Sequence, residues 1–277
     1  MARAKLGYRF PEELWTRLEP LIPPHANPHP RGGGRPRRAD RDCADGIFFV
    51  LRTGCQWEAL DTTGLCPHST AHDRFQEWVE AGVWQKLWAA LLEHYDEVRG
   101  LDWRWLSVDG SQGKAPLASV AEHGGPNPTD RGKRGVKRSV VTEAAGVPVG
   151  IVVAGANRND HLLLAATLDA IVVPRPAPSA EAPQGLCLDK GYDYASTREV
   201  AAARGLTLHL RTRGEEALAQ REHPGGKARR WVVERAHSWL HRFRRILVRW
   251  EKKAVNYAAM LHLAAATIVA GQAGIFG

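Results

Sequence analysis

Hydrophobic positions recur at helical spacing through the first part of the chain. Apolar side chains fall three or four positions apart, which predicts helices over 9–22, 45–51 and 69–92. The segment 70–78 follows a turn and could serve as the recognition helix of a helix-turn-helix unit, although the same pattern fits a helix that only packs. We therefore expect an all-helical DNA-binding domain over residues 1–98.

Beyond Gly100 the pattern changes to short alternating or continuous apolar runs. Such runs, bounded by turn residues, are typical of strands, and Ala145-Gly146 is a hairpin signal. The order is three strands, a helix, a strand, a helix and a strand, followed by two more helices. This order favours an α/β domain over residues 103–277. The predicted strands are 103–108, 138–143, 147–154, 185–188 and 206–210, and the predicted helices include 160–171, 231–253 and 255–270.

The segment 231–253 has an amphipathic helical pattern with one acid, Glu234, in its first turns. Glu234 lies off the apolar stripe, in a row of basic and polar residues. Such a glutamate is either a solvated surface acid or a metal ligand, and the helix alone does not decide between them. The stripe consists of Val232, Ala236, Trp239, Leu240, Phe243, Ile246, Leu247 and Trp250.

Two further acids directly follow predicted strands. Asp109 comes after 105–108 and Asp189 comes after 185–188. If these strands are neighbours, both carboxylates converge on one sheet edge, where ligands of α/β proteins tend to bind. An Asp before Gly is also a common turn residue. Together with Glu234, the two acids form an oxygen-rich set suited to Mg²⁺ or Mn²⁺, and two such ions can support phosphodiester cleavage.

The chain is strongly basic, with a net charge of +8 at pH 7. This charge favours a polyanionic partner, nucleic acid first, and the abundant arginine suits bidentate phosphate contacts. The basic segment 130–138 lacks the spacing of a P-loop, so contact with a phosphate backbone is the better interpretation there. The Gly-Arg-Pro stretch at 34–36 could enter a minor groove or form a flexible basic loop.

Cysteine spacing and the apolar segments argue against several other classes. Four cysteines without CxxC spacing argue against a disulfide framework, and a zinc site from Cys55, Cys66, His68 and His72 is the less favoured interpretation. No secretory signal is visible, and the apolar stretch 260–274 is short for a membrane span. We therefore expect a cytoplasmic protein whose last helix is buried.

Several blocks of the sequence resemble one known family. They include Gly-Arg-Pro at 34–36, Leu-Arg-Thr-Gly-Cys-Gln-Trp at 51–57, Val-Asp-Gly-Ser at 108–111, Leu-Asp-Lys-Gly-Tyr-Asp at 188–193 and Val-Glu-Arg at 233–235. These blocks, in this order and over nearly the whole chain, resemble the DDE transposases of bacterial insertion sequences, of the IS-five family with an IS-four-like catalytic domain.

This resemblance implies a fold, a reaction and a site. The fold would be a ribonuclease-H-like catalytic domain, with a mixed sheet flanked by helices, after a helical DNA-binding domain. Asp109, Asp189 and Glu234 would be both the catalytic and the metal-binding residues, with two Mg²⁺ or Mn²⁺ ions as cofactors. The enzyme would cleave double-stranded DNA at the terminal inverted repeats of a transposon and transfer the 3′-hydroxyl into target DNA. A homodimer or higher oligomer would bring two ends together.

Cations near these blocks are the candidate DNA contacts. Related enzymes often show Tyr-x2-Arg-x3-Glu-x6-Lys around the catalytic glutamate. Here Lys227 stands at the Tyr position and His241 at the final Lys position, so Arg242 could hold the phosphate instead. The candidates are Arg35, Arg37, Arg38, Arg74, Arg131, Lys133, Arg134, Lys137, Arg138, Lys190, Arg230, Arg235, His241, Arg242 and Arg245.

Two other functions fit the same residues. A ribonuclease-H-like nuclease or resolvase would cut DNA without strand transfer. A domesticated DNA-binding regulator would not cut at all, and the presence of all three acids weighs against it.

Overall fold

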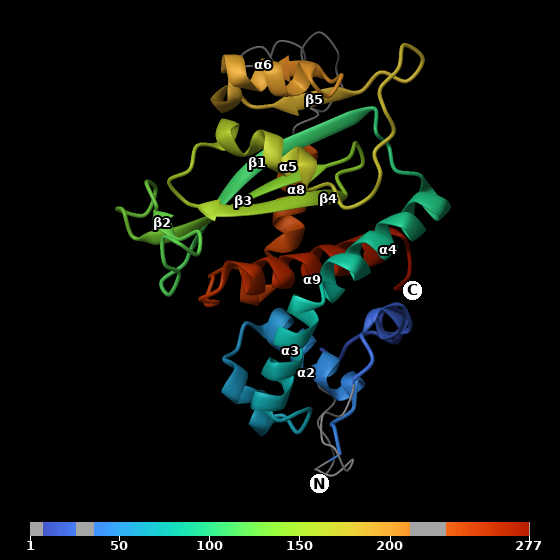
Figure 1. Cartoon of the computed structure of the whole chain (residues 1–277), viewed down its shortest axis with the longest axis vertical. Helices are drawn as coiled ribbons and strands as arrows, with labels where there is room; N and C mark the ends of the chain where they lie inside the picture. The colour runs from blue at the N-terminus through green and yellow to red at the C-terminus, as the bar shows by residue number, and fades with distance from the viewer. Residues whose placement is uncertain (1–7, 26–35, 211–230, 277) are drawn as a thin grey trace.

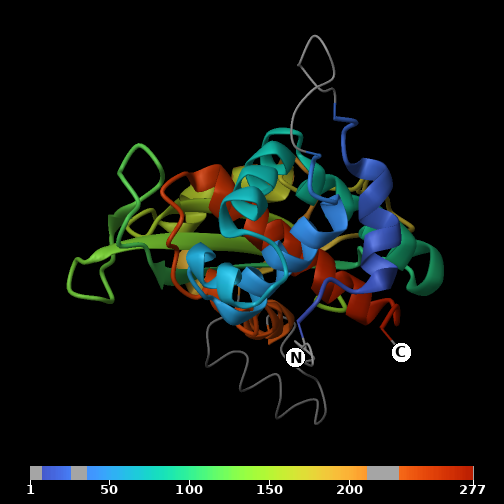
Figure 2. The ribbon, with the colours of Figure 1, turned by 90° about the horizontal axis from the view of Figure 1, so that it is seen from below.

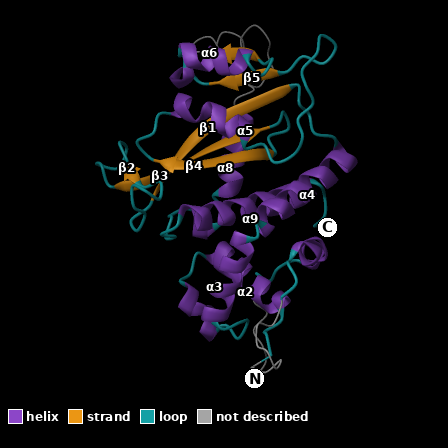
Figure 3. Cartoon of the chain, viewed as in Figure 1, coloured by secondary structure: helices purple, strands orange, loops and turns teal. Residues whose placement is uncertain are grey.

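The computed structural model describes residues 8–25, 36–210 and 231–276. Figure 1 shows a helical region, formed by the first described elements, at one end of the molecule and a β-sheet with its own helices at the other end. Two long helices, α4 (Val83–Arg99) and α9 (Ala254–Gln272), lie side by side between these parts. Figure 3 shows the same division by secondary structure.

The helical region forms because amphipathic segments bury their apolar faces against one another. Phe75, Trp78 and Trp84 are buried and pack ring against ring. The predicted helix over 69–92 is wrong in one respect, because the structure has two helices there. Gly82, at a φ of 66°, adopts the left-handed conformation that separates them. The elements before α4 are α1 (Glu12–Leu18), η1 (Glu19–Leu21), α2 (Asp40–Thr53), η2 (Trp57–Thr62) and α3 (His68–Glu80).

The sheet has the order β2-β3-β1-β5-β6, with β4 paired to β3. β1 pairs antiparallel with β3 and parallel with β5. β1 to β4 pair antiparallel, and β5 and β6 continue the sheet in parallel from β1. This mixed sheet flanked by helices is that of the ribonuclease-H-like class, which confirms the predicted fold. The strands are β1 (Trp105–Lys114), β2 (Gly125–Pro126), β3 (Arg134–Thr142), β4 (Pro148–Gly155), β5 (Gly185–Leu188) and β6 (Thr207–Leu210), and each predicted strand overlaps one of them.

Helices cover both faces of this sheet. α5 (Leu164–Asp169) and α6 (Ala195–Ala202) lie on one face, and α8 (Trp231–Leu240) and α9 lie on the other. Figure 2, seen from below, shows the helical region in front of the sheet, on the α9 side. Two short 3₁₀ helices, η3 (Asp160–Leu163) and η4 (Lys190–Tyr192), follow β4 and β5.

One hydrophobic core joins the helical region to the sheet. Trp88 of α4 is fully buried, donates a hydrogen bond of 3.3 Å from Nε1 to the Pro148 carbonyl, and stacks on His262 of α9. α9 is long and apolar enough to cross a membrane, but 72% of its most apolar window is buried inside the protein. The prediction of a buried last helix is confirmed. The division at residues 98 and 103 stays a prediction.

The helix predicted over 231–253 is shorter in the structure. α8 ends at Leu240, and a 3₁₀ turn, η5 (Arg244–Ile246), follows it. The backbone N–H of Arg249 donates to the Lys114 carbonyl at 2.8 Å, so this segment pairs with the end of β1 instead of continuing as a helix. Trp250 is therefore 47% exposed, although its spacing predicted a place on the buried stripe.

Candidate functional site

Asp109 and Asp189 occupy equivalent positions on neighbouring parallel strands. The pairing of β1 with β5 joins residues 80 apart in sequence, from Trp105 with Gly185 to Ser107 with Cys187. Asp109 and Asp189 are also 80 residues apart, and each lies two residues beyond the last pair, Ser107 with Cys187. Because neighbouring strands lie about 4.8 Å apart, the backbones of the two acids lie close together at the carboxyl end of β5. The expected convergence of these two acids agrees with this register.

Backbone amides orient both carboxylates. Asp109 Oδ1 accepts a hydrogen bond of 2.8 Å from the Gly110 N–H, and Asp189 Oδ1 accepts one of 2.8 Å from the Gly191 N–H. The second contact caps η4, the short helix that follows β5. Each carboxylate is thus held by the turn or strand that follows it, and each is partly exposed to solvent.

Glu234 approaches from α8, which packs on β1 and β3. Val233 and Ala236 face the core, whereas Glu234 lies in the first turn and is exposed. One turn further along, His237 Nε2 lies 3.9 Å from Asp109 Oδ2. Glu234 is therefore about one helical turn from the point where α8 passes Asp109.

His237 is a further residue beside Asp109. Its ring is buried at the point where α8 passes this aspartate. Burial and the nearby charge of Arg138 lower the pKa of His237 to about 3, so the ring is neutral at pH 7. A neutral imidazole beside Asp109 adds no positive charge that would compete with a cation there.

Asp160 and Tyr192 are two more neighbours that sequence reasoning missed. Tyr192 is 1% exposed, and burial raises the pKa of its hydroxyl, with further increases from the charges of Asp160, Asp109 and Asp189. Asp160 makes an ion pair with Lys137, and Asn159 takes the cap position of η3. No periodicity could have identified these residues, because their proximity arises from sheet packing.

The donor chemistry at the sheet edge fits a divalent cation. Asp109 and Asp189 offer hard carboxylate oxygens, which Mg²⁺ and Mn²⁺ prefer. Within the described parts of the chain, no three Asp, Glu, His or Cys side chains are already arranged as ligands of one ion. The complete set of Asp109, Asp189 and Glu234 therefore stays a prediction.

Four of the predicted DNA-binding cations are buried. Their side chains or residues are at most 7% exposed, and each one has an ion pair or hydrogen bonds inside the protein, because an unpaired buried charge is costly. The prediction that these four side chains contact DNA phosphate directly is therefore wrong. They are Arg74, paired with Asp40 and Glu77; Lys137, paired with Asp160; Arg138, bonded to the Ile246 carbonyl and His241; and Arg245, paired with Glu251.

Other predicted cations are exposed. The turn between β2 and β3 carries Arg131, Lys133 and Arg134, and it lies about 20 Å from Asp109 along β3, because Asp109 pairs with Val140, six residues beyond Arg134. Lys190, His241 and Arg242 are exposed at the ends of β5 and α8. Arg235 lies between Trp231 and Trp239, 4.4 and 4.8 Å from their ring centroids. Arg35 and Arg230 lie outside the described residues.

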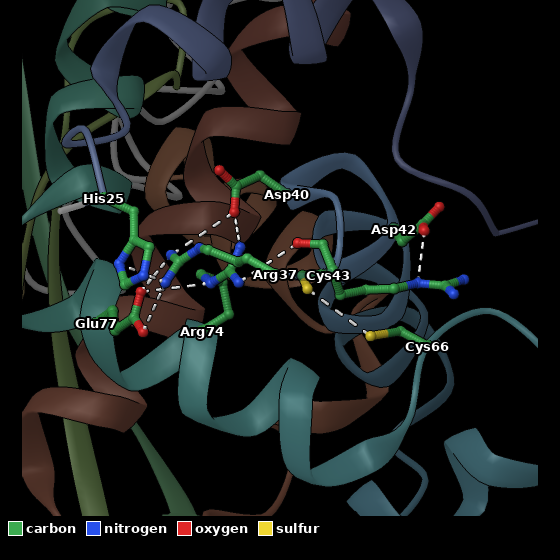
Figure 4. A network of polar contacts seen from close by, with 9 residues as sticks. His25, Arg37, Asp40, Asp42, Cys43, Cys66, Arg74 and Glu77 are labelled. Carbon is green, nitrogen blue, oxygen red and sulfur yellow. Dashed lines mark hydrogen bonds and ion pairs between the residues drawn. The ribbon is translucent and has the colours of Figure 1, made fainter. Parts of the chain in front are cut away.

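The cations of the helical region take part in a network between α2 and α3 (Figure 4). Arg37 and Arg74 point toward the carboxylates of Asp40 and Glu77, and Arg37 reaches Glu77 at 2.6 Å. Arg38 pairs with Asp42 at 2.7 Å but is 47% exposed, so it keeps solvent access. Beside this network, the buried thiols of Cys43 and Cys66 lie 3.7 Å apart.

Family models match most of the chain. A model described as “Transposase DDE domain” matches residues 96–269, and one described as “Putative transposase of IS4/5 family” matches residues 10–88. Among solved structures, the Mos1 transposase paired-end complex with left transposon end has a TM-score of 0.29 at 11% identity, over 90% of this chain and 82% of that one. The catalytic domain of Mos1 mariner transposase also has a TM-score of 0.29, at 9% identity, over 69% and 92%.

Two proteins of Burkholderia cepacia are similar in sequence. The “Putative transposase for insertion sequence element IS402” is 40% identical over 144 residues, which are 50% of this chain and 64% of that protein. The “Insertion element IS402 uncharacterized 16.2 kDa protein” is 35% identical over 105 residues, 38% and 71% of the two chains. The chain thus spans just under two thirds of the first relative. Because the DDE model covers more than half of its length and contains both strand-end acids and Glu234, this chain belongs to the DDE transposase family of the IS4/5 kind.

Proposed function

We propose that the protein is a transposase that cuts DNA at transposon ends and joins the freed 3′-hydroxyl to target DNA, with Mg²⁺ or Mn²⁺ as cofactor. The observation that carries this proposal is the register of β1 and β5, since Asp109 and Asp189 each lie two residues beyond its last pair, Ser107 with Cys187. The class of reaction, DNA transposition, is inferred from membership of the DDE transposase family. The alternatives are a nuclease that cuts DNA without joining it and a regulator that binds DNA without cutting it. The assays below distinguish the proposal from both.

The three acids have distinct places in this proposal. Asp109 and Asp189 hold the divalent ion or ions at the sheet edge, and Glu234 completes the ligand set from α8. When bound, such ions lower the pKa of a nucleophilic water or hydroxyl and stabilise the charge on the leaving oxygen. The backbone amides of Gly110 and Gly191 keep the two aspartates oriented, so less reorganisation is needed when metal binds.

The exposed cations bind the DNA backbone in this proposal. Lys190, His241 and Arg242 lie at element ends near the acids, where they contact the strand that is cut, and the β2–β3 turn contacts DNA further away. Binding then weakens steeply with salt, because each neutralised phosphate releases counterions. The partners are the terminal inverted repeats and target DNA. A homodimer or higher oligomer assembles because two ends must be joined.

A cleavage assay tests the chemistry. A labelled duplex that carries the element's own terminal repeat is incubated with Mg²⁺, Mn²⁺ or EDTA and with wild type or Glu234→Gln. We expect metal-dependent nicking at the repeat boundary that Glu234→Gln loses, while the matched control Glu199→Gln, an exposed glutamate on α6, keeps it. Full cleavage by Glu234→Gln would contradict the assigned third ligand.

A joining assay tests the second half of the reaction. Ends supplied with a free 3′-hydroxyl are mixed with a target plasmid and metal. A transposase links the end to the plasmid, whereas a nuclease leaves it unjoined. Tight end binding without cleavage or joining in any metal would instead indicate a regulator.

A further inference from the structure

A fourth carboxylate, Asp160 at the start of η3, lies against the residue that follows Asp109. A Cβ atom placed on Gly110 would be 2.0 Å from Asp160 Oδ1 and 3.0 Å from its Cγ. A side chain at position 110 would therefore displace the Asp160 carboxylate. The absence of a side chain on Gly110 leaves room for this acid beside the strand.

Lys137 on β3 holds one oxygen of this carboxylate. Its Nζ lies 2.8 Å from Asp160 Oδ2, and the lysine side chain is 5% exposed. The Cδ of Lys137 would be 3.5 Å from a Cβ on Gly110, so the lysine and the aspartate lie on the same side of β1. This contact fixes the orientation of Asp160 and determines which of its oxygens stays available.

The other oxygen, Asp160 Oδ1, has no hydrogen-bond partner among the described residues, although the atom is buried. The carboxylate as a whole is 34% exposed, so water can reach the site. A buried carboxylate oxygen normally accepts a hydrogen bond, because leaving it unpaired costs free energy. Its position indicates a partner from outside the described residues.

Tyr192 lies beside the same group of acids. Its side chain is 1% exposed, and its buried hydroxyl lies within electrostatic reach of Asp160, Asp109 and Asp189. The stacked rings of His161 and Tyr194, with centroids 3.7 Å apart, join η3 to the segment that follows Asp189. Asp160 thus belongs, with Asp109 and Asp189, to a group of acids whose charges all act on the Tyr192 hydroxyl, and such acids repel one another unless a cation is present.

The alternation of side chains along β1 explains how these groups meet. Asp109 points toward α8, where His237 approaches it, and Gly110 faces the opposite side, where Asp160 rests. β5 ends at Leu188, so no described strand pairs with β1 on this side at Asp109 and Gly110. Asp160 therefore reaches the open edge from the α5 face, while Glu234 belongs to the α8 face.

We propose that Asp160 is a positioning residue of the metal centre, with Oδ1 accepting a hydrogen bond from water bound to the cation and Lys137 holding Oδ2. This inference rests on the proposed function, because it requires that Asp109 and Asp189 bind a divalent ion. It assigns Lys137 an electrostatic role in place of the DNA contact expected from the sequence. The alternative is a structural ion pair that only secures η3 against β3.

Mn²⁺ affinity separates these two roles. Free Mn²⁺ is measured by electron paramagnetic resonance during titration of the whole protein, for wild type, Asp160→Asn and Lys137→Gln. We expect Asp160→Asn to weaken Mn²⁺ binding by about 10–100-fold, the usual effect of removing an acceptor that supports a metal ligand. Lys137→Gln should tighten binding, because it removes a positive charge and leaves the acids in place. A purely structural ion pair would not change affinity in opposite directions.

A matched control lies on the same segment. Asp169, at the end of α5, is 64% exposed and pairs with Arg204, so Asp169→Asn removes the same charge away from the site. Its Mn²⁺ affinity should equal that of wild type. Thermal unfolding and circular dichroism of each variant show whether it is folded. If Asp160→Asn does not fold, the Mn²⁺ affinity of Lys137→Gln tests the inference instead. Unchanged or weaker Mn²⁺ binding by Lys137→Gln would then overturn it.

Asp109→Asn distinguishes failure of this inference from failure of the proposed function. If wild type binds no Mn²⁺, or if Asp109→Asn binds it as well as wild type does, the metal centre itself is wrong. If Asp109→Asn loses binding while Asp160→Asn keeps wild-type affinity, only the role of Asp160 is wrong. Loss of binding in both, with Asp169→Asn unchanged, supports both proposals.

Discussion

Two clusters of charge in this protein differ in how their charges are balanced. Between α2 and α3, Arg37 and Arg74 face Asp40 and Glu77, and each charge has a partner of opposite sign (Figure 4). At the edge of the sheet, the negative charges are in excess. The cluster between α2 and α3 is therefore neutralised by its own ion pairs and requires no bound ion.

The cluster at the sheet edge is not balanced in this way. Asp109, Asp160 and Asp189 all act on Tyr192, and Lys137 pairs with Asp160. Excess charge of one sign is unfavourable for folding and favourable for binding a cation. Under the proposed function, the paired cluster serves stability, whereas the acidic cluster at the sheet edge serves ligand binding.

The largest effect should come from Asp109→Asn. Loss of a metal ligand removes several kcal/mol of transition-state stabilisation, and about 4 kcal/mol equals roughly a thousandfold in rate. We expect cleavage of the terminal repeat to fall by at least this factor. The melting temperature should stay the same or rise, because one of several repelling charges is gone. A melting temperature that falls sharply would show that Asp109 stabilises the fold, which contradicts the comparison.

Arg74→Ala should have the opposite result, with stability lost and the metal site intact. Arg74 is 4% exposed, so its removal leaves Asp40 and Glu77 without a buried partner. We expect the free energy of unfolding to fall by about 3 kcal/mol, at the low end for breaking a buried ion pair, because both acids keep some contact with water. Urea unfolding measures this. Arg38→Ala, which breaks the exposed pair with Asp42, is the matched control and should cost about 0–1 kcal/mol.

Gly110→Ala should perturb the sheet edge more mildly. The new methyl group collides with the Asp160 carboxylate, and such overpacking costs about 1–2 kcal/mol in unfolding free energy. Mn²⁺ affinity should fall as well, because the carboxylate moves. Gly271→Ala in α9, where the nearest atom to a new Cβ is 3.7 Å away, should be neutral or slightly stabilising. If Gly110→Ala and Gly271→Ala had the same unfolding free energy and the same Mn²⁺ affinity, Asp160 would be easily displaced.

The smallest effect concerns an exposed charge, Asp61, next to the helical region's network. Its carboxylate accepts hydrogen bonds from the backbone N–H and Nδ1 of His68, and the backbone bond is the main reason that the pKa of Asp61 lies below its ordinary value of 3.8. A lowered carboxylate pKa stabilises the fold above pH 3.8 and ceases to do so as pH falls through the folded-state value. Asp61→Ala should therefore lower the melting temperature slightly at pH 6, and this difference should shrink at pH 3. If the difference in melting temperature between wild type and Asp61→Ala grew as the pH fell, the lowered pKa of Asp61 would not be its cause.

The fold was largely predictable from the pattern of apolar residues. The strands over 138–143 and 147–154 and the buried helix over 255–270 were found because each depends on local periodicity. The helix ends were harder to place. α8 stops at Leu240 because the following segment pairs with β1, a contact that no local pattern encodes.

The site was predictable in part. Asp109 and Asp189 were found because an acid after a strand is a local signal, and the resemblance to a family added Glu234 to them. The DNA contacts were predicted less well. Arg74 and Arg138 have the same charge as an exposed arginine, and only packing shows that they are buried.

The sequence by itself determined most of the secondary structure, the basic character of the chain and the positions of three acids relative to their strands and helix. These properties depend on neighbours within a few residues. Tertiary structure alone decided that Asp109 and Asp189 share one register, that Lys137 faces Asp160 and that Gly110 makes room for it. The physical reason is that strand pairing and the packing of η3 against the sheet bring together residues separated by 23 to 80 positions in these contacts, and local periodicity does not record such distances.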